Sequence, residues 1–252
     1  MNSLTPSALI RPPSTSLAAK SRILKPHAKP KKPPLMRRYE CLTEQTTNTL
    51  IAPALPLFEA AFSAFARGTV FKTNQGPCPV EDLMPGMALD TVDHGLQPLL
   101  WRGMMNIVPN TPTNHPESQQ LARVMQGSFG FARPEADLML GPAAEIVRPA
   151  PTGGAPNLTP VTALIDDHTV FHTSPPSSVQ VFHLMLPRQC GLIANGVQLA
   201  SYHPPLERVR LLGPNMKQLF MSFFPHIKRP EDFGPALRNE KSASRDADLH
   251  WA

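Results

Sequence analysis

The stretch FARGTVFKTNQGPCPVEDLMPGM, residues 65–87, contains the sequence pattern that decides the fold. Residues 68–73 (GTVFKT) alternate between apolar and polar side chains, which is the period of a half-buried β-strand. Residues 74–77 (NQGP) supply the Asn and Gly of a tight turn, and residues 78–83 (CPVEDL) return. The pattern predicts a β-hairpin, followed at once by a Pro-Gly turn.

Short apolar or β-branched runs of the same kind continue through the middle of the chain, each bounded by Gly, Pro, Asn or Asp. They occupy residues 137–148, 161–173, 179–186 and 191–202. Many short strands at this spacing, with few helical windows between them, are typical of an all-β domain. We therefore expect one β-domain over residues 67–204.

The flanks of this domain carry helical spacing. Residues 51–66 place Leu55, Phe58, Phe62 and Phe65 on one helical face, which predicts a lead-in helix packed on the domain. Residues 205–229 predict a second packed helix, capped by Asn215. After it, residues 230–252 are charged and are expected to form a tail.

The first part of the chain differs in charge from the rest. Residues 1–38 hold nine Lys or Arg and no Asp or Glu, whereas the remainder holds fifteen basic and nineteen acidic residues. Residues 1–50 are also Pro-rich, with few large apolar side chains, so we expect a disordered basic tail that is removable without unfolding the domain. Such a tail is a candidate for contact with an anionic surface, but the body gives no strong nucleic-acid signal.

Metal, disulfide and membrane signals are weak in this sequence. The three cysteines form no CxxC pair, so neither a disulfide framework nor a structural zinc site is expected. His168 and His172 would share one face of a helix, but their β-branched surroundings favour a strand, on which they would lie about 13 Å apart. No apolar run reaches the ~18 residues that cross a bilayer, and no secretory signal is visible. We expect a cytoplasmic protein with no metal and no cofactor.

Five segments in order carry a resemblance to a known family. They are AFARGT at 64–69, PVEDL with MPGM at 79–87, GLQPLLWRG at 95–103, DLMLGPAAEIV at 137–147 and VQVFHLML at 179–186. In this order they resemble the motifs of a bacterial Hint (Hedgehog/intein) domain, which implies an all-β Hint-like fold over roughly 64–204. In that family, Trp101 and Arg102 correspond to a strand in which packing is the expected role.

The resemblance also implies a chemistry, an N-to-S acyl shift in which a first-position Cys attacks the preceding carbonyl and a His protonates the leaving nitrogen. The nucleophile position falls on Ala64. The Ser-Pro-x-His block falls on residues 141–144, with Gly141 and Ala144 in place of the hydroxyl and the imidazole. The Asp-Arg-His segment that follows the last motif ends here on Gln189. These four positions are therefore vacant, and no catalytic residue is predicted.

Three functional hypotheses follow. The favoured one is a Hint-type domain that is inactive in autoprocessing and is kept as a scaffold or binding module. The second is a self-cleaving enzyme with a displaced nucleophile, for which Cys78 and Cys190 are the thiols to consider, although neither lies in a family motif. The third is an adaptor that uses its basic tail to hold an anionic partner, with no partner specified by the sequence.

Overall fold

Two antiparallel sheets make up most of the computed structural model, which describes residues 35–113, 115–150 and 154–237. Within these residues, α-helices lie only outside 67–203: α1 (Pro56–Glu59) precedes the predicted domain, and α2 (Leu206–Arg210) and α3 (Pro214–Met221) follow it. The all-β prediction is confirmed.

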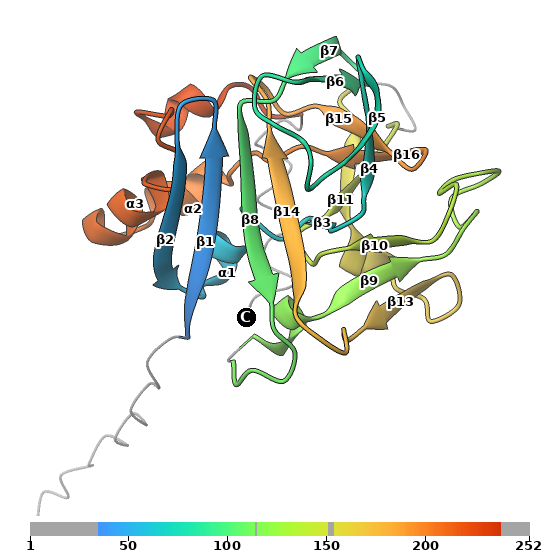
Figure 1. Ribbon diagram of the computed structural model, residues 1–252, viewed down its shortest axis with the longest axis horizontal. Helices are drawn as coiled ribbons and strands as arrows, with labels where there is room; N and C mark the ends of the chain where they lie inside the picture. Colours follow the sequence, from blue (N-terminus) through green and yellow to red (C-terminus); the bar gives the residue numbers. More distant parts are fainter. Residues whose placement is uncertain (1–34, 114, 151–153, 238–252) are drawn as a thin grey trace, which may run out of the picture. The chain divides into compact units, whose positions relative to one another are not determined.

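The first sheet has eight strands in the order β13-β9-β10-β3-β14-β8-β1-β2. Its longest strands, β2, β1, β8 and β14, lie side by side in Figure 1. The bounds are β1 (Met36–Thr43), β2 (Thr47–Pro53), β3 (Phe65–Ala66), β8 (Trp101–Ile107), β9 (Leu121–Val124), β10 (Leu138–Leu140), β13 (Val170–Thr173) and β14 (Val179–Met185).

The second sheet follows the order β12-β11-β16-β15-β4-β6-β7, with β5 paired to β4. Its bounds are β4 (Val70–Thr73), β5 (Gly76–Pro79), β6 (Ala88–Thr91), β7 (Gly95–Pro98), β11 (Glu145–Arg148), β12 (Asn157–Pro160), β15 (Gly191–Ala194) and β16 (Val197–Ala200). The predicted hairpin is β4 and β5, which pair antiparallel from Thr73↔Gly76 to Val70↔Pro79. Gly76 has φ +105°, a conformation that L side chains rarely adopt, so the turn depends on this glycine.

The expectation of a disordered tail over 1–50 is wrong for residues 36–50. They form β1 and most of β2, and β1 also pairs with β8 through Tyr39↔Met105 and Cys41↔Gly103. The strand was missed because Arg37 is buried at 7% exposure, so the inward face of β1 does not show as a run of apolar residues. Residues 1–34 lie outside the described part of the chain.

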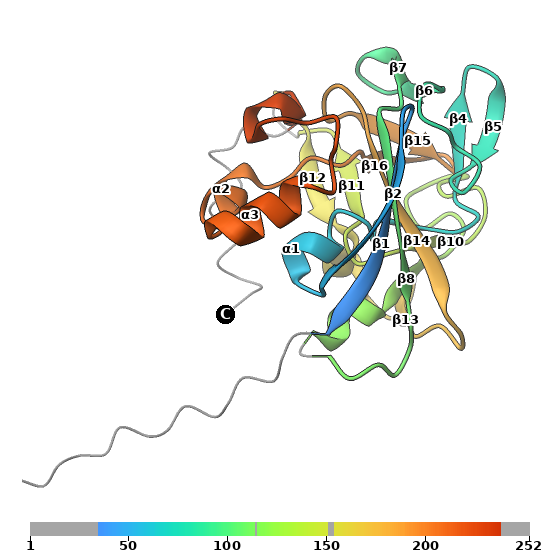
Figure 2. The ribbon, with the colours of Figure 1, turned by 60° about the vertical axis from the view of Figure 1, so that its left-hand side comes forward.

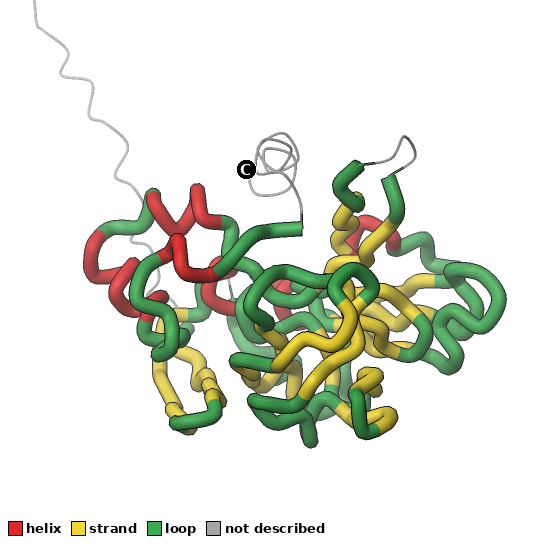
Figure 3. The backbone as a smooth tube through the Cα atoms, turned by 90° about the horizontal axis from the view of Figure 1, so that it is seen from above, coloured by secondary structure: helices red, strands yellow, loops and turns green. Residues whose placement is uncertain are grey.

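The predicted helices are also shorter than expected. The lead-in helix is confined to α1, and Phe65 belongs instead to β3. The second predicted helix is two helices, and the N-cap of α3 is Gly213, with Asn215 inside the helix, because Pro214 takes the first helical position. Figures 1 and 2 show these helices gathered on the side of β1 and β2, and Figure 3 shows from above that most helical segments lie on one side.

The expected tail after 230 is likewise corrected in its first part. Residues Pro230–Phe233 form a 3-10 turn, η3, and Phe233 is buried against Phe224 at a centroid distance of 4.9 Å. This aromatic contact fixes the segment, which composition alone had marked as polar. Residues 238–252 lie outside the described residues.

Smaller differences concern single elements. Two 3-10 turns, η1 (Pro116–Gln119) and η2 (Val161–Leu164), lie within the β-domain, and η2 occupies part of a run expected to be strand. The GLQPLLWRG segment contains two strands, because β7 ends at Pro98 and Trp101 begins β8. His172 lies in β13, whereas His168 lies in the turn before it.

The buried apolar residues form two clusters. The first, the aliphatic cluster, contains only three aromatic residues, Phe65, Phe71 and Phe182, among leucines, valines and alanines. The second, the aromatic cluster, contains Tyr39, Phe58, Phe62, Trp101, Tyr202, Phe220, Phe223, Phe224 and Phe233. Position 103 of β8 requires glycine, because a Cβ there would lie 2.2 Å from the Trp101 ring of the aromatic cluster. In the described residues, no helix is long and apolar enough to cross a membrane.

Candidate functional site

The peptide bond between Ser63 and Ala64 has every polar atom in a hydrogen bond. Ala64 N donates to Phe182 O (3.0 Å), and the Ser63 carbonyl accepts from Ala143 N (3.1 Å). The Ala64 carbonyl accepts from Gly141 N (2.8 Å). The sequence-predicted nucleophile position and the 141–144 block, more than 70 residues apart in the chain, are thus in direct contact.

Gly141 is required by this contact. A Cβ at position 141 would lie 2.0 Å from the Ser63 carbonyl oxygen, closer than any real contact. Position 141, which the resemblance matches to a serine, therefore has no space for a side chain, because the two backbones approach so closely.

Ala144 completes this contact from the other side of the turn. It is fully buried, its N–H donates to Gly141 O (3.1 Å), and its carbonyl accepts from Val161 N (2.9 Å). Its methyl group packs in the aliphatic cluster, where the family's motif has an imidazole. The turn donates one backbone N–H, from Ala143, to the Ser63 carbonyl and one, from Gly141, to the Ala64 carbonyl, and positions 141–144 carry no titratable side chain.

Gln189 serves as a structural bridge. Its Nε2 donates to Ser201 O (3.2 Å), and its Oε1 accepts from Leu237 N (3.0 Å). Its own N–H donates to Pro235 O (3.0 Å), so the side chain and backbone both hold the segment that follows η3. An amide in these bonds cannot exchange a proton near neutral pH, as the family's histidine would.

A cleft of about 800 Å³ opens beside these residues. Ser63, Ala144 and Gln189 all line it, so the structure brings three neighbouring parts of the predicted site to one place. Its wall is mainly apolar, with the acidic side chains Glu59, Glu117, Glu145 and Glu207 around it. This size and polarity are ordinary for a ligand or peptide site.

His183 is a residue of this site to which the sequence analysis assigned no role. The β3–β14 register pairs Phe65 with Phe182, so His183 follows as the residue opposite Ala64. Its Nδ1 lies 3.0 Å from Ala60 O, and burial lowers its pKa to about 4. The imidazole is therefore neutral at pH 7. The pairing register of β3 and β14 identifies His183 as a neighbour of Ala64, and a single sequence does not give that register.

Tyr202 lies next to His183 in the cleft wall, with ring centroids 5.0 Å apart. Its hydroxyl is buried and has no hydrogen-bond partner among the described residues. Burial raises the pKa of this phenol, so it stays protonated and is a potential donor. A buried hydroxyl without a partner is unusual in a folded protein.

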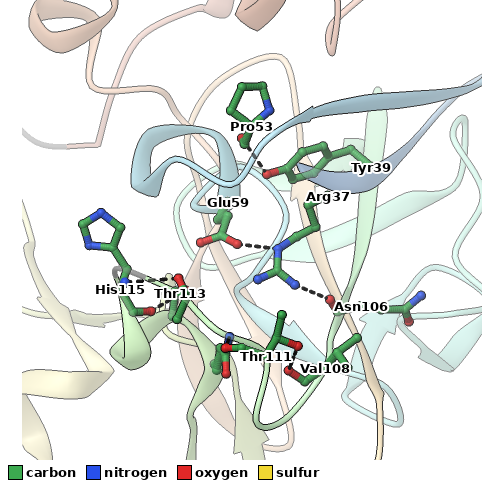
Figure 4. Close-up of polar contacts among 11 residues, drawn as sticks. Arg37, Tyr39, Pro53, Glu59, Asn106, Val108, Thr111, Thr113 and His115 are labelled. Carbon is green, nitrogen blue, oxygen red and sulfur yellow. Dashed lines mark hydrogen bonds and ion pairs between the residues drawn. The ribbon is translucent and has the colours of Figure 1, made fainter. Parts of the chain in front are cut away.

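A buried ion pair lies at the α1 end of the cleft (Figure 4). Arg37 Nε is 2.5 Å from Glu59 Oε1, although the N–H direction does not meet hydrogen-bond geometry, and Arg37 Nη1 donates to Asn106 O (2.9 Å). The side chains are only 7% and 3% exposed. The pair joins β1, α1 and β8, and Glu59 is the member that lines the cleft.

The cysteines of the described chain lie outside the cleft lining, and their thiols are shifted toward the protonated form. Among the residues that line the cleft within the described chain, none is a cysteine. Burial raises the pKa of Cys190 to about 11 and that of Cys41 to about 12, and it also raises the pKa of Cys78. All three thiols are therefore protonated, and weakly nucleophilic, at neutral pH.

Comparison with known proteins gives one family. The family model described as "Hint domain" matches residues 63–205, more than half of the chain. No sequence among curated proteins matches significantly. Two solved structures are similar at low identity. The solution structure of a bacterial intein-like domain from Clostridium thermocellum has 11% identity and a TM-score of 0.40, with 56% of this chain and 99% of that chain covered. The crystal structure of the TvoVMA intein has 10% identity and a TM-score of 0.38, with 55% and 96% covered.

Proposed function

Because the chain belongs to the Hint domain family, we propose that it is a member that does not process itself and uses the cleft beside Ser63–Ala64 as a binding site. Two observations support this proposal: residue 64 is an alanine, and a cavity lies beside the Ser63–Ala64 peptide. The fold alone does not specify it, since one fold carries many functions. The site residues supply the support.

The observation that carries the proposal is the environment of the Ser63–Ala64 peptide. An acyl shift there needs a nucleophile on residue 64, and Ala64 offers a methyl group. The Ser63 carbonyl keeps a single N–H donor, Ala143, which favours a polarised carbonyl but attacks nothing. The imidazole position holds Ala144, whose methyl group is packed in the core.

The cleft supports the binding half of the proposal. A vacated catalytic site under no constraint would be free to fill with larger side chains, yet a cavity of about 800 Å³ remains beside Ala144. Tyr202 adds an aromatic ring to the cleft wall beside the neutral imidazole of His183.

The test is the intact mass of the purified chain, measured with and without a thiol or hydroxylamine. We expect the full mass in every case, because an uncatalysed peptide bond is stable for years in water. The matched variant is Ala64→Cys combined with Ala144→His, with Ala64→Cys alone as control. Thiol-induced cleavage between residues 63 and 64 in the double variant alone would identify the two vacant positions. Spontaneous cleavage of the parent chain at that bond would overturn the proposal.

A second candidate function rests on Ser63 itself. Ser63 lines the cleft together with His183, whose imidazole is neutral at pH 7. Attack of Ser63 Oγ on the Phe62 carbonyl would form an ester, break the Phe62–Ser63 C–N bond and leave the proton on the new amine. The same mass measurement separates this reaction, since hydroxylamine would then cut between 62 and 63. Ser63→Ala would abolish that cut.

A further inference from the structure

The last described residues of the chain run along the cleft. His203 Nε2 lies 3.0 Å from Gly234 O, Gln189 N donates to Pro235 O (3.0 Å), and Leu237 N donates to Gln189 Oε1 (3.0 Å). Ala236 is itself part of the cleft wall. The described part of the chain therefore ends at the cleft.

The path of this segment is fixed by Gly234. Its φ is +78°, and a Cβ would lie 2.1 Å from Pro187 O, so the chain turns here in a conformation that only glycine accepts. The turn follows Phe233, which is anchored in the aromatic cluster. The direction in which the chain leaves residue 237 is thus set by the core.

The chemistry of the cleft matches an extended peptide with basic residues. Pro142, Leu158 and Leu206 provide apolar wall, and Glu145 and Glu207 provide negative charge. Among the described residues, the cleft lining has one Arg or Lys, Arg208, and four glutamates, of which Glu59 is paired with Arg37 and Glu207 with Arg210. A peptide bound here needs cationic side chains near the glutamates and an apolar group for the wall.

Residues 238–252, RNEKSASRDADLHWA, combine a basic first part with apolar groups near the end. The first eight carry three cations, Arg238, Lys241 and Arg245, against Glu240, whereas the last seven carry the carboxylates Asp246 and Asp248, so only the first part of the segment is basic. Leu249 and Trp251 follow as apolar groups. Fifteen residues span up to about 50 Å when extended, at roughly 3.3 Å per residue, which exceeds the length needed to cross a cleft of this volume.

We propose that the cleft is a peptide-binding site and that its occupant is the chain's own segment 238–252. The inference rests on the proposed function, since it takes the cleft beside Ser63–Ala64 as a binding site. A tethered peptide acts at an effective concentration of roughly millimolar, so even a weak interaction fills the cleft. An external peptide of similar chemistry must then compete with this segment.

Fluorescence of Trp251 provides the first test. The chain has two tryptophans, and Trp101 is fully buried with its Nε1 bonded to Phe223 O (2.8 Å). The variant Trp251→Phe gives the Trp101 background. We expect Trp251 in the full chain to be quenched by acrylamide at least threefold less efficiently than in the free peptide 238–252. Equal quenching would overturn the proposal, and protection that appears only at high protein concentration would assign the cleft to a second copy instead.

Binding in trans provides the second test. A chain ending at Leu237, shown by its melting curve to be folded, should bind a fluorescent 238–252 peptide, and the full chain should bind it at least tenfold more weakly. Glu145→Lys with Glu207→Lys should weaken binding about tenfold or more. The matched charge change Glu44→Lys with Glu135→Lys, at exposed sites outside the cleft, should not. No binding to the shortened chain, or equal effects of the two double variants, would contradict the inference.

A third variant covers failure of the shortened chain to fold. Leu249→Ala with Trp251→Ala in the full chain keeps every described residue. Because these changes weaken the chain's own segment, the labelled peptide should bind this variant at least tenfold more tightly than the parent chain. Peptide binding that stays as weak as for the parent chain would overturn the proposal. Intact mass tests self-processing independently, so the failure of this inference and the failure of the proposed function are distinguishable.

Discussion

The two buried clusters lie on opposite faces of the same strands and differ in composition and origin. All residues of the aliphatic cluster lie between Ala64 and Leu199, within the Hint match at 63–205. Eleven of the eighteen residues of the aromatic cluster lie outside that match, in β1, β2, α1 with its following turn, α2, α3 with the residues after it, and η3. The family domain therefore has a second core, built mostly by its flanks.

Strand β14 shows how the two cores share one sheet. Phe182 and Leu184 face the aliphatic cluster, and Val181 and Met185 face the aromatic one. A strand buried on both faces cannot present either face to water without a large loss of apolar burial. The flanks are thus a structural requirement for this chain, which distinguishes it from a self-sufficient domain with tails.

The largest expected effect comes from deleting residues 1–53. This deletion removes Tyr39 and Cys41 from the aromatic cluster, uncovers the edge of β8 and leaves Glu59 without Arg37. The combined loss exceeds a typical domain stability of about 5–15 kcal/mol, so we expect no cooperative unfolding transition by calorimetry. Deletion of residues 1–34 is the matched control and should keep the melting temperature. A cooperative transition at the parent temperature after the longer deletion would show that the aromatic cluster is dispensable.

The next effect concerns the buried ion pair between β1 and α1 (Figure 4). Arg37→Leu leaves the buried Glu59 carboxylate unpaired and should lower the free energy of unfolding by about 3–5 kcal/mol. Replacing both residues, Arg37→Leu with Glu59→Leu, should restore most of that loss, since two apolar groups replace two charges. Urea titration of the four proteins of this cycle measures the coupling. If the losses of the two single variants add up in the double variant, Arg37 and Glu59 are not coupled, and packing alone holds the β1–β2 hairpin.

A smaller effect comes from His183, where the two clusters meet at the cleft. Burial lowers its pKa to about 4, below the value of about 6.5 expected in the unfolded chain. The unfolded chain therefore binds a proton first as pH falls, and stability present above pH 6.5 is lost progressively down to pH 4. The loss is at most about 3 kcal/mol, at 1.36 kcal/mol per pKa unit.

His183→Asn removes this titration and is the control. The difference in unfolding free energy between the parent and the variant should therefore change across pH 4–6.5 and stay constant above it. Burial also lowers the pKa of His226, but both proteins contain this residue, so its contribution cancels in the difference. A constant difference over the whole range would place the His183 ring in contact with water.

The sequence by itself determined the all-β class, the 68–83 hairpin, the Hint resemblance and the residue types at the positions compared with the family's motifs. These follow from local signals: an alternating strand pattern, turn residues such as Gly76, and the residue type at Ala64 or Gln189. The residue type alone states whether a position carries a thiol or an imidazole. No tertiary information is needed for that.

Only the tertiary structure decided that residues 36–53 form strands and that Phe233 belongs to the core. Tyr39 pairs with Met105, and Phe233 packs on Phe224 beside Trp101, so their stability comes from contacts distant in sequence. In β1 a charged residue, Arg37, occupies an inward position, so the alternation of apolar and polar residues is not visible in the sequence. Arg37 can be buried there because Glu59 neutralises its charge, and Glu59 is too distant in sequence to appear in the same window. The same reason applies to the cleft: Ser63, Ala144 and Gln189 meet only when β3, β14 and the turn before β11 are assembled. Local pattern sets residue chemistry and strand period, whereas long-range pairing decides which segments have a partner to pack against.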